Sequence, residues 1–375
     1  MIFALKVARL FDGTSMQEDM AVLIEGDRIV EVLPAGKLSM NIAVDDLGEG
    51  LLAPGFIDVQ LNGGGGAFMN DNPTRETVKK IADSHRRFGT TGLLPTVITD
   101  DPQITEMAVA AVQSAIDDKV TGVLGIHLEG PFLDPSRKGA HPANFIRTIN
   151  NADVKRIVAI ECGVVMMTLA PNKVPAVVIQ ELSRHGILVS LGHAEATSRE
   201  VRLALDSGAR AFTHIYNAMS QLKGREPGMV GVGLSDAESF CGVIVDGLHV
   251  DDIALKILFA TKPPSRVMLI TDAMPPAAGG PESFSLQGRV ARRIGQSLEL
   301  EDGTLAGSIV TMDEAVRRSV QLGVKIEDAL RMASAVPAEF LRKSDELGHI
   351  KAGFKASLVH LTDDLRAKKT WIDGL

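Results

Sequence analysis

The sequence predicts an α/β protein in which a (β/α)8 barrel carries a small β domain built from both chain termini. Three observations predict this fold class. The middle of the chain alternates eight short apolar segments with helical patterns, and eight parallel strands are the number that closes such a barrel. Both ends of the chain show strand patterns without a convincing helix. The length of 375 residues accommodates one large barrel and an accessory piece.

The small β domain is expected from short apolar or alternating runs that are separated by glycine turns. Near the N-terminus these runs cover residues 3–8, 20–25, 28–33 and 42–47, with turns at Gly13 and Gly26. Residues 357–361 and 369–373 return to the same pattern. We therefore expect residues 1–52 and 345–375 to form a discontinuous β-sandwich domain, with the barrel, residues 53–344, inserted between them.

The barrel is expected from strands and helices that follow one another along the chain. Amphipathic helices are predicted over residues 74–88, 174–185 and 198–207, and each of them ends at a glycine, which is a common helix C-terminus. A further helix over residues 311–322 presents one apolar stripe to the core. The eight predicted strands are residues 55–60, 93–96, 122–129, 164–168, 187–193, 211–214, 242–246 and 266–272.

Composition and charge exclude several classes of protein. The chain has 39 Lys and Arg against 47 Asp and Glu, and the net charge of −8 argues against a nucleic acid or an anionic membrane as the main partner. No uncharged run approaches the ~20 residues that span a bilayer. Cys162 and Cys241 are too few for a disulfide framework and form no metal-type pair. The N-terminus lacks signal-peptide features, and we expect a cytoplasmic protein.

Polar residues lie at or near the C-terminal ends of all eight predicted strands. In a (β/α)8 barrel these ends converge at the face where catalytic groups gather. The eight residues are Gln60, Thr96, Glu129, Thr168, His193, His214, Asp246 and Asp272.

Three of these side chains form a candidate metal site. Glu129 precedes a Gly-Pro turn, whereas His193 and His214 each end an apolar run. Three protein ligands leave a fourth position for water, which is the arrangement of a catalytic zinc rather than a structural one. A single histidine at a strand end is more often a hydrogen-bonded structural residue, and the pattern alone leaves that interpretation open.

Asp272 ends a nearly continuous apolar strand, where a carboxylate is costly to bury without a partner. Beside an activated water it would act as a general base, and otherwise it would cap a following turn. His127 shares a strand face with Glu129 and would either support it or pack in the core. Four further histidines are expected away from the site, two on helical surfaces and two in the β domain: His85, His185, His349 and His360.

Several motifs, taken in order, resemble a known family over nearly the whole chain. The string Ala53-Pro54-Gly55-Phe56-Ile57-Asp58 before a glycine-rich loop resembles the first barrel strand of the amidohydrolase superfamily. Within that superfamily the sequence is similar to the N-acetylglucosamine-6-phosphate deacetylases. The segments that carry this resemblance are Gln60-Leu61-Asn62-Gly63, His127-Leu128-Glu129-Gly130-Pro131, Gly192-His193, Thr213-His214-Ile215-Tyr216-Asn217-Ala218-Met219, Asp246-Gly247-Leu248-His249, Thr271-Asp272-Ala273 and Leu305-Ala306-Gly307-Ser308.

The resemblance implies an activity, a fold and a set of site residues. The activity is the hydrolysis of N-acetylglucosamine 6-phosphate to glucosamine 6-phosphate and acetate, in amino-sugar catabolism and recycling, and the fold is an amidohydrolase barrel with a split β domain. It also implies a homodimer in which part of the phosphate site comes from the second subunit. By resemblance, Glu129, His193 and His214 bind the metal, Asp272 is the acid and base, His141 polarises the acetyl carbonyl, and the substrate contacts are Ala140, His141, Asn217, Ala218, Arg225, His249, Ala306, Gly307 and Ser308, with Arg225 and His249 on the phosphate.

One departure from the wider superfamily predicts the number of metal ions. Many amidohydrolases carry His-x-His at the end of the first strand and a bridging lysine on the fourth. Here the first strand ends in Gln60 and Asn62, and the fourth contains no lysine. Because an amide is a poor replacement for imidazole on a transition metal, we expect one divalent ion per subunit. Zinc is the expected ion, and the ligand set also suits iron, cobalt and manganese.

Two alternatives remain at the level of sequence. The first is a deacetylase for N-acetylgalactosamine 6-phosphate or another N-acyl sugar, which would use the same metal chemistry. The second is a metal-free (β/α)8 protein that binds a sugar phosphate as a sensor or isomerase. A fold alone does not decide between them, because function belongs to the site.

Overall fold

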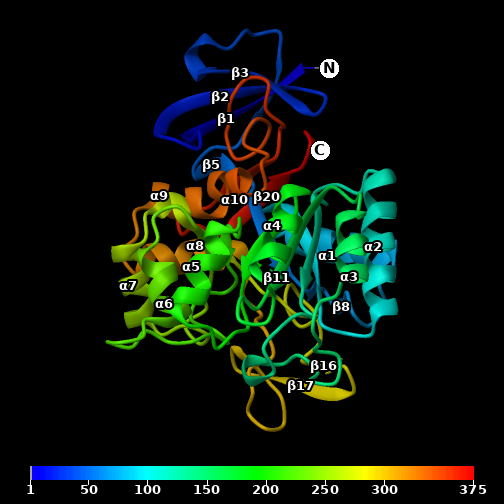
Figure 1. The fold of residues 1–375 in the computed structure, drawn as a ribbon. Coiled ribbons are helices and arrows are strands. Elements are labelled where there is room, and N and C mark those ends of the chain that lie inside the picture. Colours follow the sequence, from blue (N-terminus) through cyan, green and yellow to red (C-terminus); the bar gives the residue numbers. More distant parts are fainter. Residues whose placement is uncertain (1) are drawn as a thin grey trace.

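A computed structural model describes residues 2–375 and divides them into a barrel and a smaller β domain at one end of it (Figure 1). The β domain is a single seven-stranded sheet in the order β20-β19-β5-β1-β2-β3, with β4 paired to β1. Both ends of the chain contribute to it, as predicted. Its strands are β1 (Ile2–Phe11), β2 (Met16–Glu25), β3 (Arg28–Pro34), β4 (Ala43–Asp46), β5 (Leu51–Pro54), β19 (Leu358–Leu361) and β20 (Ala367–Trp371).

The alternation of side chains along these strands explains why the sheet forms. Leu5 and Val7 of β1 pack in one apolar cluster, whereas Ala4 on the opposite strand face belongs to a second cluster with Ala21 and Leu23. The strand β5 was not predicted, and it pairs with both β1 and β19. It joins the two chain ends and extends the sheet to Pro54, two residues past the expected domain boundary.

The barrel contains all eight predicted strands in parallel order. The sheet runs β15-β14-β13-β12-β11-β10-β9-β6, and an isolated bridge between Leu61 and Ala273 joins the last strand to the first. The barrel is therefore closed. Its strands are β6 (Phe56–Leu61), β9 (Thr90–Ile98), β10 (Gly125–Glu129), β11 (Val164–Leu169), β12 (Leu188–Leu191), β13 (Ala211–Phe212), β14 (Phe240–Ile244) and β15 (Val267–Ile270).

Helices surround the barrel on its outer side (Figure 1). The four predicted helices correspond to α1 (Arg75–Arg86), α4 (Ala176–Arg184), α5 (Ser198–Asp206) and α8 (Met312–Gln321). Their ends have physical causes: Thr74 caps α1, and Thr197 and Glu200 form a capping box at α5. The structure adds helices that the sequence reading did not place: α2 (Pro102–Asp117), α3 (Asn151–Val158), α6 (Gly228–Ser235), α7 (Asp252–Thr261), α9 (Ile326–Ala333) and α10 (Ala335–Phe340).

A small antiparallel sheet lies at the end of the barrel opposite the β domain (Figure 1). Its strands are β16 (Ser283–Leu286), β17 (Arg289–Ile294) and β18 (Ser297–Glu299), none of which was predicted. It packs on a two-residue hairpin, β7 (Gly63–Gly64) and β8 (Ala67–Phe68), through the rings of Phe68 and Phe284, whose centroids are 5.9 Å apart. The sheet therefore lies close to the C-terminal ends of the barrel strands.

One expectation about the histidines is wrong. His85, which was expected on a helix surface, is fully buried on α1, and its Nε2 atom lies 3.1 Å from the carbonyl oxygen of Gly63. The glycine-rich hairpin explains the error, because the ring occupies the space that a Cβ atom on Gly64 would need. His185 is exposed as expected. Within residues 2–375 no helix has the length and hydropathy needed to cross a membrane.

Candidate active site

Glu129, His193 and His214 converge at the C-terminal end of the barrel strands. The Oε1 atom of Glu129 lies 3.3 Å from Nε2 of His193 and 3.0 Å from Nε2 of His214, and the two Nε2 atoms are 3.0 Å apart. All three side chains are at least nine-tenths buried. The strand-end pattern predicted this convergence, and the three groups form a cluster that could hold a metal ion.

The donor atoms of this cluster fit a metal ion. The Nδ1 atom of His193 lies 2.9 Å from the carbonyl oxygen of Arg137, which only accepts, so Nδ1 carries the proton and the lone pair is on Nε2. Nε2 therefore faces His214 and Glu129 as a ligand atom. In the described part of the chain, the buried Nδ1 of His214 has no hydrogen-bond partner. Two imidazole nitrogens and one carboxylate oxygen suit zinc and its neighbours in the first transition series.

Electrostatics in the cluster favour an ionised carboxylate. Burial alone would raise the pKa of Glu129, but hydrogen bonds from His193 and His214 outweigh it and hold that pKa well below its usual range. Burial opposes charge on His214 as well, yet the neighbouring Glu129 raises the net pKa of that imidazole. The cluster thus concentrates negative charge where a cation would bind.

Asp272 follows β15 and faces the same cluster. Its Oδ1 atom accepts hydrogen bonds from Nδ2 of Asn62 at 2.6 Å and from Nε2 of Gln60 at 3.2 Å. Gln60 Nε2 also donates to Oε1 of Glu129 at 3.1 Å. Burial, together with the nearby charge of Glu129, raises the pKa of Asp272 to about 6. A carboxylate with such a pKa is suited to accept and return a proton near neutral pH.

His141 lies beside the cluster with its ring orientation fixed. The backbone N–H of Thr99 donates to Nδ1 of His141 at 3.3 Å, so Nδ1 accepts and the ring proton is on Nε2. Nε2 points toward Glu129, 3.9 Å from its Oε2 atom. Burial, together with the charge of His193, lowers the pKa of His141 to about 3. His141 is therefore a neutral hydrogen-bond donor.

The backbone turns sharply at three of these residues. His193, His214 and Asp272 have φ angles of 49°, 33° and 50°, and a non-glycine residue in this left-handed region carries strain of about 1–3 kcal/mol. Each lies two residues past the end of its strand. The turn ends strand pairing and directs the side chain into the mouth of the barrel.

A cavity of about 270 Å³ lies in front of this cluster. Not all of the predicted substrate-binding residues line it. Ala306 packs in an apolar cluster, and the hydroxyl of Ser308 donates to the carbonyl oxygen of Thr271. Arg225 is exposed on a loop outside the cavity, and Gln60 lies behind Asp272. The predicted residues that do line the cavity are Asn62, Glu129, Ala140, His141, His193, His214, Asn217, Ala218, His249, Asp272 and Gly307.

Several residues that hold the cavity-lining groups in place were not predicted from the sequence. Asp246 was noted as a strand-end residue and as part of the Asp246–His249 segment but was given no role, and its carboxylate accepts from Nδ1 of His249 at 2.6 Å, which fixes that ring. Thr99, which orients His141, carried no signal in the sequence. Arg289 of β17 donates to the carbonyl oxygen of Ala140 and so ties the small sheet to the cavity wall. The spacing Asp246 to His249 is the one signal that could have indicated a paired group.

His127 is part of the barrel interior behind the cluster. It points to the same side of β10 as Glu129, and its Nε2 atom lies 2.7 Å from the hydroxyl of Thr168. Its Nδ1 atom lies 3.4 Å from the hydroxyl of Thr96. Burial lowers the pKa of His127 to about 4, so the ring is neutral. It packs beneath the metal-type cluster and does not line the cavity.

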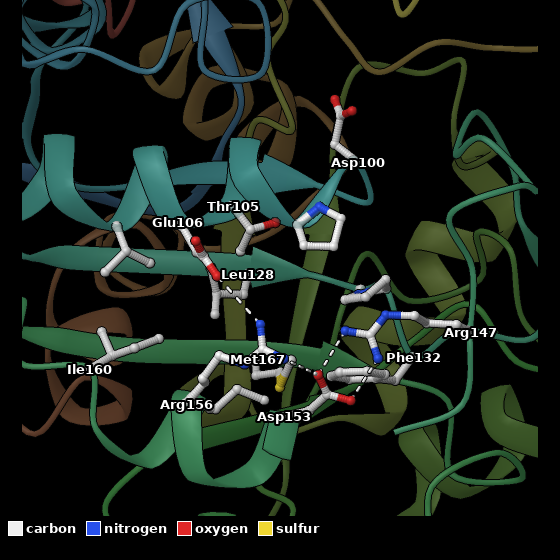
Figure 2. Close-up of a pocket in the computed structure, with 15 residues that line it drawn as sticks. Asp100, Thr105, Glu106, Leu128, Phe132, Arg147, Asp153, Arg156, Ile160 and Met167 are labelled. Atoms are coloured by element: carbon white, nitrogen blue, oxygen red, sulfur yellow. Dashed lines mark hydrogen bonds and ion pairs between the residues drawn. The ribbon is translucent and has the colours of Figure 1, made fainter. Parts of the chain in front are cut away.

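A larger cavity of about 370 Å³ lies on the outer side of β10 and β11, between α2 and α3 (Figure 2). Its floor is apolar, and four of its five charged groups are paired with one another. Both terminal nitrogens of Arg147 bind the carboxylate of Asp153, at 2.6 and 2.7 Å, and Arg156 contacts Glu106. Across residues 2–375, the buried polar atoms without partners include none from this cavity, whereas Asn62, His214 and Asn217 supply three in the smaller one. Buried polar atoms without a partner can form hydrogen bonds to a bound ligand, so the smaller cavity is the candidate active site.

Comparison with known proteins places this site in a family. The sequence model of the Amidohydrolase family matches residues 51–375. The chain belongs to the amidohydrolase family. It is 42% identical, over 88% of its own length and 83% of the relative's, to an N-acetylgalactosamine-6-phosphate deacetylase of Shewanella sp. (strain ANA-3).

Two solved structures of the family are similar over nearly the whole chain. An N-acetylglucosamine-6-phosphate deacetylase from Pasteurella multocida has a TM-score of 0.97 at 32% identity, with 100% of this chain and 99% of that chain covered. An enzyme of the same name from Mycobacterium smegmatis, in complex with N-acetyl-D-glucosamine-6-phosphate, has a TM-score of 0.92 at 30% identity, with 100% and 98% covered. The predicted fold is therefore confirmed, and so is the predicted family.

Proposed function

We propose that the chain removes the acetyl group of N-acetylglucosamine 6-phosphate by hydrolysis and releases glucosamine 6-phosphate and acetate. The observation that carries this proposal is the convergence of Glu129, His193, His214 and Asp272 on one buried cavity in an amidohydrolase barrel. Both solved relatives bear the name of this activity, and one of them holds this sugar phosphate.

A divalent metal ion is assigned to Glu129, His193 and His214, one ion per subunit, with zinc as the expected metal. When bound there, such an ion would supply a water activated for attack at neutral pH. Asp272 would accept the proton of that water and return it to the nitrogen of the departing sugar amine. Its pKa of about 6 suits both transfers.

His141 would stabilise the negative charge that develops on the acetyl oxygen. Its proton is on Nε2, which points toward Glu129, and the ring is neutral at neutral pH because burial lowers its pKa to about 3. A hydrogen-bond donor fixed before the reaction begins needs no reorganisation as the charge develops. Asn217 would contact the sugar with its buried Nδ2 atom, which has no partner within residues 2–375.

The phosphate is assigned to His249 and Arg225, with Arg225 supplied by the second subunit of a homodimer. His249 lines the cavity, whereas Arg225 of the same chain is exposed outside it, which is what a shared site requires. Large apolar side chains lie exposed around the same segment, as an interface between copies would explain. These residues are Leu222, Leu248, Ile253 and Ile257.

N-acetylgalactosamine 6-phosphate is a second candidate substrate. The relative from Shewanella, at 42% identity, is a deacetylase for this epimer, and the site chemistry is the same for both sugars. The metal-free sugar-phosphate sensor receives no support from the convergent ligand cluster. A cytoplasmic location stays a prediction.

The deciding experiment measures acetate release from both sugar phosphates, with and without a chelator. We expect release that the chelator abolishes and that one equivalent of zinc restores. The ratio of kcat/KM for the two epimers identifies the preferred substrate. Absence of acetate from both, or full activity in a metal-free preparation, would contradict the proposal.

A further inference from the structure

A buried carboxylate that the proposed chemistry does not use lies directly beneath Asp272. Asp58 of β6 is fully buried, and within the described residues no lysine, arginine or histidine forms a salt bridge with it. Burial without a cation is costly for an ionised carboxylate, and here it raises the pKa of Asp58 to about 7. Such a group lowers the stability of the fold, and its hydrogen bonds show which part of the structure it holds in place.

Two of the three hydrogen bonds of Asp58 come from Thr271, the residue before Asp272. Its Oδ1 atom accepts from the N–H of Thr271 at 3.3 Å, and its Oδ2 atom accepts from the hydroxyl of Thr271. That hydroxyl accepts in turn from the N–H of Ala273 at 3.2 Å. Oδ1 also accepts from the N–H of Gln60 at 3.1 Å. Both chain neighbours of Asp272 are therefore attached to Asp58, one directly and one through a hydroxyl.

These contacts cross the seam at which the barrel closes. The strands β6 and β15 are the two ends of the strand order, and an isolated bridge, Leu61 to Ala273, lies between them. The N–H of Asp272 donates to the carbonyl oxygen of Gln60 at 2.9 Å, and the N–H groups of Asn62 and Gly63 donate to that of Ala273 at 3.0 and 2.8 Å. Elsewhere in the barrel, neighbouring strands are held by ladders of backbone hydrogen bonds. At the seam the backbone bonds are few, and the side chain of Asp58 adds two hydrogen bonds from Thr271 to them.

The seam also sets the distance between Asp272 and its hydrogen-bond donors. Gln60 and Asn62 belong to the β6 side, whereas Asp272 belongs to the β15 side and has a strained φ of 50°. The 2.6 Å bond from Asn62 to Oδ1 of Asp272 therefore depends on how the two strands are held together. If the seam relaxed, the carboxylate would lose this orientation.

We propose that Asp58 is a positioning residue, which aligns Asp272 with Gln60 and Asn62 by joining β6 to the Thr271–Ala273 segment. This inference rests on the proposed function of Asp272 as the proton acceptor. Asp58 touches neither the metal-type cluster nor the cavity, so its effect reaches the reaction through the Thr271–Ala273 segment and through Gln60. A small misplacement of a catalytic group lowers kcat by about 10- to 100-fold.

The test compares Asp58→Asn, Asp272→Asn and the double variant in acetate release, KM and metal content. The asparagine amide keeps only one accepting oxygen, so Asp58→Asn should lower kcat about 10- to 100-fold, with KM and metal content close to wild type. On the Asp272→Asn background the same change should lower the residual rate no further. A matched pair separates the hydrogen bond from packing: Thr271→Val removes the hydroxyl and should reproduce the loss, whereas Thr271→Ser keeps it and should lose much less.

Three results would overturn the role of Asp58: an unchanged kcat, a loss of kcat that follows a loss of metal, or full additivity in the double variant. If Asp58→Asn does not fold, the comparison of Thr271→Val with Thr271→Ser decides the question. The two proposals fail in different ways. A wild-type protein that releases no acetate from either sugar phosphate overturns the proposed function and this role with it. A normal wild type together with an unaffected Asp58→Asn overturns the role of Asp58 alone.

Discussion

Replacement of His141 by alanine tests how much the fixed imidazole contributes to the reaction. The ring is 4% exposed and neutral, and its proton is held on Nε2 by the backbone N–H of Thr99. The variant removes this donor and leaves the metal-type ligands in place, since His141 is not one of them. It also leaves the Thr99 N–H without its acceptor, at a stability cost of about 1–2 kcal/mol, which a folded domain tolerates.

The expected loss follows from the position of the donor. In a dry site, one preorganised donor to a developing oxyanion contributes about 3–4 kcal/mol, which corresponds to a kcat lower by about 10²- to 10³-fold. The ground-state carbonyl needs this hydrogen bond far less than the transition state does, so KM should change by less than about threefold. Because the ring stays neutral above a pKa of about 3, its titration should not appear in the pH profile of the wild type.

The assay is acetate release under saturating sugar phosphate, with metal content and thermal unfolding measured on the same samples. His141→Asn is the matched control, because its amide retains an N–H donor and should recover part of the rate. A kcat within tenfold of wild type for His141→Ala would refute the assignment, as would a loss that follows the metal content.

Three further changes probe other parts of the structure. Asp272→Asn removes the proton acceptor and should lower kcat by about 10²- to 10⁴-fold while substrate still binds, as measured by calorimetry; near-normal turnover would exclude Asp272 as the base. Arg225→Ala should raise KM for the phosphorylated sugar and leave the free sugar unaffected, whereas Arg184→Ala, an exposed arginine at the end of α4, should change neither; an unchanged preference would place the phosphate elsewhere. Asp153→Asn tests stability. Its hydrogen bonds to Arg147 lower the pKa of Asp153, so they stabilise the fold above the unfolded-state pKa of about 3.9 and lose that effect as pH falls through the lower folded-state pKa. The variant should be less stable by about 1–3 kcal/mol at pH 7, and its stability should fall less than that of the wild type between pH 5 and pH 2; parallel pH curves would contradict this.

The fold could be predicted largely because its main signals are local. Each barrel strand is a short apolar run, and a glycine follows within three residues of the end of α1, α4 and α5. The helix α6 was not predicted because nearly all of its residues are buried, so its sequence shows no alternation of polar and apolar faces with the helical period. The sheet β16–β18 was not predicted for a different reason. It follows the last barrel strand and packs on segments that are distant in the sequence, and its own sequence does not indicate those contacts.

The candidate site likewise contains residues that the sequence could predict and residues that it could not. Glu129, His193, His214 and Asp272 were predictable because parallel strands bring their C-terminal ends together, so a position along the strand fixes a position in space. Residues that act through hydrogen bonds from outside this face gave no such signal. Thr99 and His85 show the limit, since each takes part in a contact between a histidine ring and a backbone group that only the folded chain brings together.

The amides at the end of β6 link the sequence to the number of metal ions. Carboxylates only accept hydrogen bonds, so the nitrogens of Gln60 and Asn62, and not their oxygens, must face Glu129 and Asp272. Imidazoles at these positions would present lone pairs to a second cation, whereas the amides present N–H groups whose positive ends repel one. The same N–H groups neutralise part of the charge between two carboxylates that would otherwise repel each other across the cavity. The β6 amides thus perform electrostatically what a second cation would otherwise do, which supports the proposal of one ion per subunit.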